Sequence, residues 1–215
     1  AMQPLQVFLG QWNTTTRNMG AGSAKWVWDF KTDKSQPALV MSTKDHPYFE
    51  SVRLTFLTDQ QKYQLTAIDK EKQKRTYQGK FTEELHYITG DTGKPEPRFE
   101  MMLDEVGNED ARKLVGVKLA QRDRNRMWME VFRRVGKTTQ KQDTVANQRE
   151  GTSFAVSDTD YGDRECIVSQ GLGTTTVTYM GRTFYVCCSG CQAAFNDDPT
   201  FWINKAEERK KTEKK

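Results

Sequence analysis

Hydrophobic and polar residues alternate in short runs along roughly the first two thirds of the chain. In the run 52–56, VRLTF, the apolar Val52, Leu54 and Phe56 are separated by polar residues. A period of two is typical of a strand that buries one face. Turn-forming residues separate the runs, which begin about a dozen residues apart. The runs are 24–30, 38–43, 51–57, 63–68, 76–81, 85–89, 99–103, 113–120 and 127–135.

This succession of strands predicts a mainly β protein. Nine or ten consecutive strands with short connections favour antiparallel pairing between neighbours. A closed or nearly closed up-and-down barrel accommodates them best, because closure removes the edges that an open sheet would expose. No long helical period appears before about position 190, so helices are expected only near the carboxyl end.

The carboxyl-terminal part has a different pattern. Residues 174–187 contain two β-rich runs around Gly181, which predict a hairpin with a tight turn at the glycine. Residues 189–195 predict a short helix. Asp198 as N-cap with Pro199 at the first helical position predicts a second helix, extending to about position 208. We expect a small α+β module.

All four cysteines of the chain lie in this part, at Cys166, Cys187, Cys188 and Cys191. A disulfide framework gains most from closing long loops, whereas these cysteines are close together in the sequence. A metal site needs thiolates that converge on one point, which a hairpin and a helix start can provide. We therefore favour a metal site; free or reversibly oxidised thiols remain the alternative.

These motifs resemble a YHS domain of the TRASH-type superfamily, which has a treble-clef fold. The matching residues, between about 165 and 203, are CIV at 166–168, YMGRTFY at 179–185, CCSGC at 187–191, Phe195 and Asp198-Pro199. The resemblance implies metal sensing, trafficking or resistance. It also implies that the patterned cysteines bind the metal.

The patterned cysteines fall on Cys166, Cys187 and Cys191. Many members of the family carry a further cysteine at the place of Ser169, so we expect an open site here. Cys188 is then an optional fourth or exchange ligand. Zinc is the expected ion, with Cu(I) or another soft metal as the alternative.

The opening Gly10-Gln11-Trp12 is similar to the start of lipocalin-like (calycin) barrels, and to small bacterial proteins of unknown function. In the calycin family the tryptophan closes one barrel end and an arginine from the last strand packs across it. Arg133 or Arg134 stands where such an arginine would come from. Trp12, Trp28 and Arg133 are accordingly our candidate ligand-binding residues in the barrel.

Two functions are carried forward. The first is a non-enzymatic protein that binds zinc or copper through the cysteine cluster, with a metal-handling protein as a possible partner. The second is a carrier or sensor of a small apolar molecule held in the barrel, with the cysteine module purely structural. We expect side chains to fill the barrel rather than to line a cavity, because small barrels leave little interior space.

The expected organisation has four parts. Residues 1–136 form the lipocalin-like barrel, and residues 137–163, which are polar, form a linker or surface wrap. Residues 164–208 form the cysteine module. Residues 209–215 form a basic, frayed tail.

Composition excludes several classes of function. The net charge is only +4 and the signs are mixed along the chain, which argues against a nucleic-acid surface. No run of apolar residues is long enough to span a membrane. Phosphate-binding, nucleophile-elbow and zinc-protease motifs are missing, so no enzyme is expected. The compartment is open; export to a periplasm or the outside is expected only if a signal segment once preceded Ala1.

Overall fold

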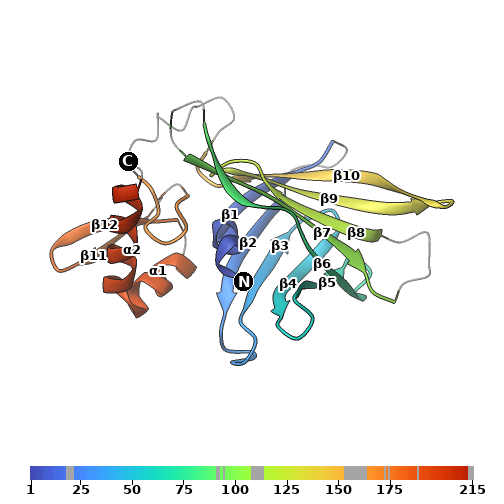
Figure 1. The fold of residues 1–215 in the computed structure, drawn as a ribbon, viewed down its shortest axis with the longest axis horizontal. Coiled ribbons are helices and arrows are strands. Elements are labelled where there is room, and N and C mark those ends of the chain that lie inside the picture. Colours follow the sequence, from blue (N-terminus) through green and yellow to red (C-terminus); the bar gives the residue numbers. More distant parts are fainter. Residues whose placement is uncertain are drawn as a thin grey trace.

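The computed structural model describes residues 1–17, 22–90, 93, 95–107, 114–152, 164–171, 173, 175–187 and 189–212. In chain order, the first elements are η1 (Gln3–Phe8), β1 (Gly10–Thr15), β2 (Gly22–Asp29), β3 (Ala38–Lys44), β4 (Phe49–Leu57), β5 (Lys62–Asp69), β6 (Lys74–Thr89), β7 (Pro95–Glu105), β8 (Leu114–Gln121), β9 (Arg126–Val135) and β10 (Thr138–Arg149). They are followed by β11 (Thr175–Tyr179), β12 (Arg182–Val186), α1 (Ser189–Asp197) and α2 (Pro199–Thr212). Figure 1 shows the second group as a small module beside one end of the first.

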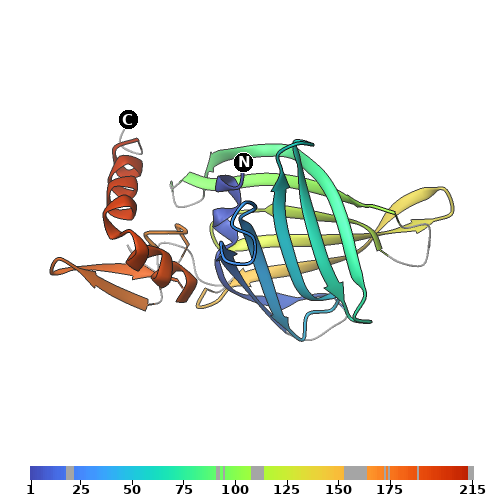
Figure 2. The same ribbon diagram turned by 90° about the horizontal axis from the view of Figure 1, so that it is seen from below.

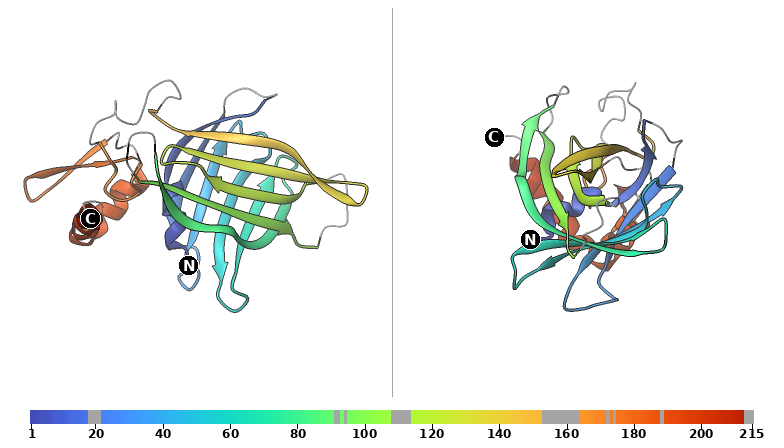
Figure 3. Two further views of the ribbon diagram at one scale, coloured as in Figure 1. Left: turned by 45° about the horizontal axis from the view of Figure 1, so that its top comes forward. Right: turned by 90° about the vertical axis from the view of Figure 1, so that its right-hand side faces the viewer.

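Strands β1 to β10 form a closed antiparallel barrel. Each strand pairs with the next one along the chain, and β1 pairs with β10 to close the ring. At this closure Trp12 lies opposite Arg149. Figure 2 and the right-hand view of Figure 3 show the strands wrapped around a common interior. The predicted mainly β class and the up-and-down barrel are therefore confirmed.

The alternation of side chains explains why the sheet curls into a barrel. On β1 the inward-facing Gly10, Trp12 and Thr14 are buried, and the residues between them are exposed. Strand β7 shows the same alternation, with Phe99 and Met101 buried. The inward residues form one continuous hydrophobic core. Burial of each large apolar side chain contributes about 1.5–3 kcal/mol, so this common interior holds the ring together.

The 3₁₀ helix η1 covers the barrel end nearest the module. Its Leu5 and Phe8 are fully buried. The ring of Phe8 lies 5.5 Å from that of Trp26 and 5.4 Å from that of Phe99, centroid to centroid. The indole Nε1 of Trp12 donates a hydrogen bond of 2.7 Å to the carbonyl oxygen of Phe8. These contacts fix η1 as a plug over this end of the interior.

The prediction of a linker over 137–163 is wrong for its first half. Residues 138–149 form β10, which pairs with both β9 and β1. Its outer half is exposed and polar, whereas Val145, Asn147 and Arg149 face the core. Residues 153–163 lie outside the described residues. The separately predicted runs 76–81 and 85–89 form a single strand, β6, with bulged register near Glu83.

The module agrees with the local predictions. Strands β11 and β12 form a hairpin in which Tyr179 pairs with Arg182, and Gly181 has a positive φ of 72° in the turn. Asp198 caps α2, since its Oδ1 accepts a 2.9 Å hydrogen bond from the N–H of Phe201.

The tail is a correction to the sequence prediction. Helix α2 extends to Thr212, so residues 209–212 are not frayed as we expected; residues 213–215 lie outside the described residues. Basic side chains in the last helical turn are favoured by the helix dipole, which explains the continuation through Arg209, Lys210 and Lys211.

Polar contacts join the module to the barrel. Lys25 on β2 donates a 2.8 Å hydrogen bond to the hydroxyl of Ser189, at the start of α1. Arg124, in the turn between β8 and β9, forms an ion pair with Glu165. The same barrel end thus meets both the helix and the loop of the module. Within the described residues, no helix is long and apolar enough to cross a membrane.

Candidate metal centre

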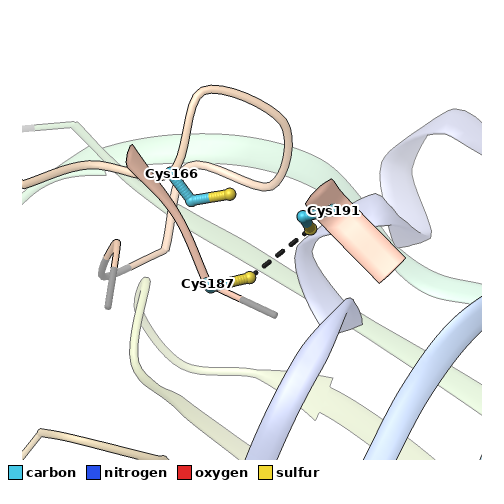
Figure 4. A group of neighbouring side chains, drawn as sticks. All are labelled: Cys166, Cys187 and Cys191. Carbon is cyan, nitrogen blue, oxygen red and sulfur yellow. Dashed lines mark hydrogen bonds between the residues drawn. The ribbon is translucent and has the colours of Figure 1, made fainter. Parts of the chain in front are cut away.

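Three cysteines from three different elements converge in the module. Cys166 lies in the loop before β11, Cys187 directly follows β12, and Cys191 lies in the first turn of α1. The hairpin brings the end of β12 beside the loop, where Cys166 forms a parallel β-bridge with Tyr185. Figure 4 shows the three side chains directed toward one another. Residues separated by the length of a hairpin therefore share one small volume.

The sulfur atoms are close enough to share one ion. All three lie within 4.8 Å of one another, and the sulfurs of Cys187 and Cys191 are 3.4 Å apart. Thiolates bound to zinc lie about 2.3 Å from it, which places them about 3.8 Å from each other in a tetrahedron. The separation of 3.4 Å for one pair and the limit of 4.8 Å for the others are compatible with this value. None of the three cysteines forms a disulfide within the described residues.

The loop that carries Cys166 is fixed by its own backbone. The N–H of Cys166 donates a 2.6 Å hydrogen bond to the carbonyl oxygen of Gly171, and the N–H of Gln170 donates one of 2.9 Å to the carbonyl oxygen of Cys166. The N–H of Ile167 bonds to the carbonyl oxygen of Tyr185, which ties the loop to β12. These bonds fix the backbone on both sides of Cys166 and anchor it to β12.

The surroundings of the sulfurs favour the thiolate form. Burial alone would raise the pKa of the Cys166 thiol, but hydrogen bonds with Cys187, Cys191 and Ser169 outweigh it and bring the pKa well below its ordinary value. One of these bonds comes from the backbone N–H of Ser169, which lies 3.4 Å from the Cys166 sulfur. Metal binding requires deprotonated cysteines, so this environment favours coordination.

Ser169 lies beside the cysteine cluster. Its side chain is buried, and its hydroxyl oxygen lies 3.2 Å from the sulfur of Cys187. A hydroxyl is a weaker ligand for soft metals than a thiolate, so Ser169 adds an oxygen beside the three sulfurs and not a fourth soft donor. Cys188, our optional fourth ligand, lies outside the described residues. Among the described residues, the histidine, cysteine, aspartate and glutamate side chains form no other cluster that could hold a metal ion.

No family model, curated protein or solved structure matches this chain. The YHS and lipocalin resemblances therefore remain expectations drawn from motifs. The barrel and the cysteine cluster are features of the structure itself.

The structure does not bring the candidate barrel residues together. Trp12 is fully buried beneath the η1 plug, and Trp28 is only partly buried and stacks on the exposed Phe30 with centroids 5.6 Å apart. Arg133 is exposed on β9, toward the barrel end away from the module. The arginine that packs on Trp12 is Arg149, not Arg133 or Arg134.

Sequence reasoning missed Arg149 because its strand was assigned to a linker. The guanidinium carbon of Arg149 lies 4.3 Å from the centre of the Trp12 ring. The signal that could have found it is the weak alternation of Val145, Asn147 and Arg149 at the end of a polar run. Ser169 was noted only as a missing cysteine; its contact with Cys187 depends on how the loop closes.

The two histidines lie in the barrel and contribute nothing to the cluster. His46 is buried between β3 and β4 at the barrel end away from the module, and its Nδ1 accepts hydrogen bonds of 3.2 and 3.1 Å from the N–H groups of Tyr48 and Phe49. Burial, together with the charge of Lys70, lowers the pKa of His46 to about 4. His86 is exposed and lies 3.5 Å from Glu83.

A groove of about 490 Å³ lies beside the cysteine loop, between α2, β12 and the barrel end. Apolar side chains such as Ile167 and Ile203 line it together with charged ones, including the paired Arg124 and Glu165. Because Glu165 and Ile167 flank Cys166, this groove forms the outer side of the loop that carries the first cysteine.

Proposed function

We propose that this protein binds a soft metal ion through Cys166, Cys187 and Cys191. The observation that carries the proposal is the convergence of three buried sulfurs within 4.8 Å of one another. Such an arrangement of thiols is costly to build for packing alone, since a hairpin, a loop and a helix start must all be placed together. It is the donor set that soft metals prefer.

Zinc is the first candidate ion. Three thiolates with the hydroxyl of Ser169, a water molecule or Cys188 at the fourth corner would give the four-coordinate shell that zinc prefers. Cu(I) is the alternative, because it accepts three sulfurs without a fourth ligand. The likeness of the cysteine motifs to YHS domains supports a role in metal sensing, trafficking or resistance, rather than catalysis.

The direct test is the metal content of the protein purified without chelators. We expect about one zinc ion per chain by elemental analysis, and its loss in the variants Cys166→Ser, Cys187→Ser and Cys191→Ser. Replacement by Co²⁺ should give the intense absorption of cobalt–thiolate bonds in the wild-type protein. Equal metal in the wild type and in all three variants would contradict the proposal.

Cys188→Ser is the matched control. Like the other three variants, it replaces one cysteine sulfur by oxygen, here in the residue next to Cys187. Retention of the ion in this variant would show that three cysteines suffice. Weaker binding would identify Cys188 as the fourth ligand, with the proposed triad intact.

A further inference from the structure

Arg149 is a buried cation at the end of β10, and each of its three guanidinium nitrogens donates a hydrogen bond to a backbone carbonyl oxygen. Nη1 donates a 2.7 Å hydrogen bond to the carbonyl oxygen of Leu9, and Nη2 donates one of 2.8 Å to that of Val7. Nε donates a 3.2 Å bond to the carbonyl oxygen of Arg124. The side chain is only 2% exposed and lies over the ring of Trp12. Arg149 therefore holds the end of the η1 plug against the barrel wall.

The cysteine module packs against the same guanidinium. A Cβ atom on Gly171 would lie 2.3 Å from Cζ and Nε of Arg149, so the glycine backbone rests directly on the arginine. Gly171 is also the residue whose carbonyl oxygen holds the N–H of Cys166. The loop that presents the first cysteine is thus supported by an arginine from the barrel.

A second contact connects the arginine with another cysteine. A Cβ atom on Gly10 would lie 2.9 Å from Nη1 of Arg149 and 3.1 Å from the sulfur of Cys187. The sulfur of Cys187 also lies 3.8 Å from the carbonyl oxygen of Leu9, which accepts a hydrogen bond from Arg149. Nη1 of Arg149 and the sulfur of Cys187 therefore lie within about 6 Å of each other, beside the space that a side chain at Gly10 would occupy.

The positive charge of Arg149 is favourable beside a metal–thiolate cluster. A divalent ion bound to three thiolates leaves one net negative charge in a buried place, which is unfavourable unless a positive group lies near. The described hydrogen-bond acceptors of Arg149 are all uncharged carbonyl oxygens. Because these partners are neutral, the positive charge of the guanidinium is available as the counter-charge of the metal–thiolate cluster.

We propose that Arg149 is a positioning residue that couples the metal site to the closed end of the barrel. It supports the Cys166 loop, balances the charge of the cluster and holds the η1 plug. Metal occupancy then stabilises the plugged barrel end, and closure of that end favours metal binding, because such coupling is reciprocal. This inference rests on the proposed function.

The test compares zinc affinity and barrel stability in matched variants. Arg149→Gln removes the charge, and Arg149→Lys keeps the charge but loses the planar fork. Gly171→Ala forces the cysteine loop and the guanidinium of Arg149 apart while keeping the positive charge. Zinc affinity is measured by competition with a chromophoric chelator, and barrel unfolding is followed by far-ultraviolet circular dichroism with and without zinc.

Two controls make the same kinds of substitution elsewhere in the barrel. Arg122→Gln removes another arginine stacked on a tryptophan, since Arg122 lies 4.2 Å from the ring centre of Trp128. Gly116→Ala adds a methyl group that meets the flexible end of Met102.

We expect Arg149→Gln and Gly171→Ala to lower zinc affinity about tenfold or more, as is typical for residues that support metal ligands. Arg149→Lys should recover part of the loss, and both controls should bind like the wild type. Zinc should raise the midpoint of barrel unfolding in the wild type but not in Arg149→Gln. If Arg149→Gln does not fold, Gly171→Ala decides.

The outcomes separate this inference from the proposed function. If the wild type binds zinc and the Arg149 and Gly171 variants keep both its affinity and the zinc-induced rise in barrel midpoint, the coupling is refuted and the metal site stands. A lower barrel midpoint in Arg149→Gln with unchanged zinc affinity would show that the arginine serves the barrel alone. Failure of the wild type to bind zinc would refute both.

Discussion

The buried His46 should make folding stability depend on pH. Its Nδ1 accepts two backbone hydrogen bonds, so the folded protein holds the imidazole neutral. Burial lowers its pKa to about 4, whereas a histidine in the unfolded chain has a pKa of about 6.5. As the pH falls below about 6.5, His46 becomes protonated in the unfolded chain but stays neutral in the folded protein. Stability is therefore lost as the pH falls through this window, and the loss ends near pH 4.

The magnitude follows from the width of the window. The two pKa values differ by about 2.5 units, and each unit corresponds to about 1.4 kcal/mol. The full effect is about 3 kcal/mol in the free energy of unfolding, a large share of the stability of a typical domain. Between pH 7 and pH 5 the loss should be about 2 kcal/mol.

Urea unfolding between pH 7.5 and pH 4.5 measures this dependence. The His46→Gln variant should flatten the slope across this range, although it lowers the stability at pH 7 by removing the ring contact with Phe49. His86→Gln, at an exposed position on β6, is the matched control and should keep the wild-type slope. The same slope in the wild type and in His46→Gln would refute the reasoning.

Two further predictions concern the η1 plug and the fourth corner of the proposed metal site. Phe8→Ala should lower the free energy of unfolding, measured in urea, by about 3–5 kcal/mol, because it removes a fully buried ring that contacts Trp26. Phe201→Ala, at an exposed position, is the control. A loss below about 1 kcal/mol in Phe8→Ala would show that η1 does not act as a plug. Ser169→Cys places a fourth sulfur beside Cys187 and should raise zinc affinity and intensify the cobalt–thiolate absorption; unchanged affinity and spectrum would show that this corner does not face the ion.

The barrel could be predicted because alternation is a local property. Strands such as β4, with Val52 and Leu54 facing inward, carry the pattern in their own residues. Strand β10 could not be found in this way, because its outer half is polar on both faces and its inner half buries Asn147 and Arg149. Only the ring closure with β1 explains why these polar residues face inward.

The convergence of the three cysteines was predictable from the sequence, whereas the contacts that surround them were not. The spacing of Cys166, Cys187 and Cys191 indicates convergence by itself, because a hairpin must bring the chain back. The contacts of Ser169 and Arg149 depend on how the loop closes and on how the module meets the barrel. Both are long-range arrangements that leave no periodic signal in the sequence.

The seam between β1 and β10 has a consequence for how the chain reaches its native state. Strand β1 can pair with β10 only after β10 has been synthesised. Trp12 and Arg149, which lie opposite each other at this seam, are therefore separated by most of the barrel sequence. Such a distant pairing is expected to be slow, since a long stretch of chain must be ordered before the contact forms. Until then the nascent sheet has two unsatisfied edges, which are prone to pair with other molecules. The rate at which β1 pairs with β10 should thus determine how much of the chain folds and how much aggregates.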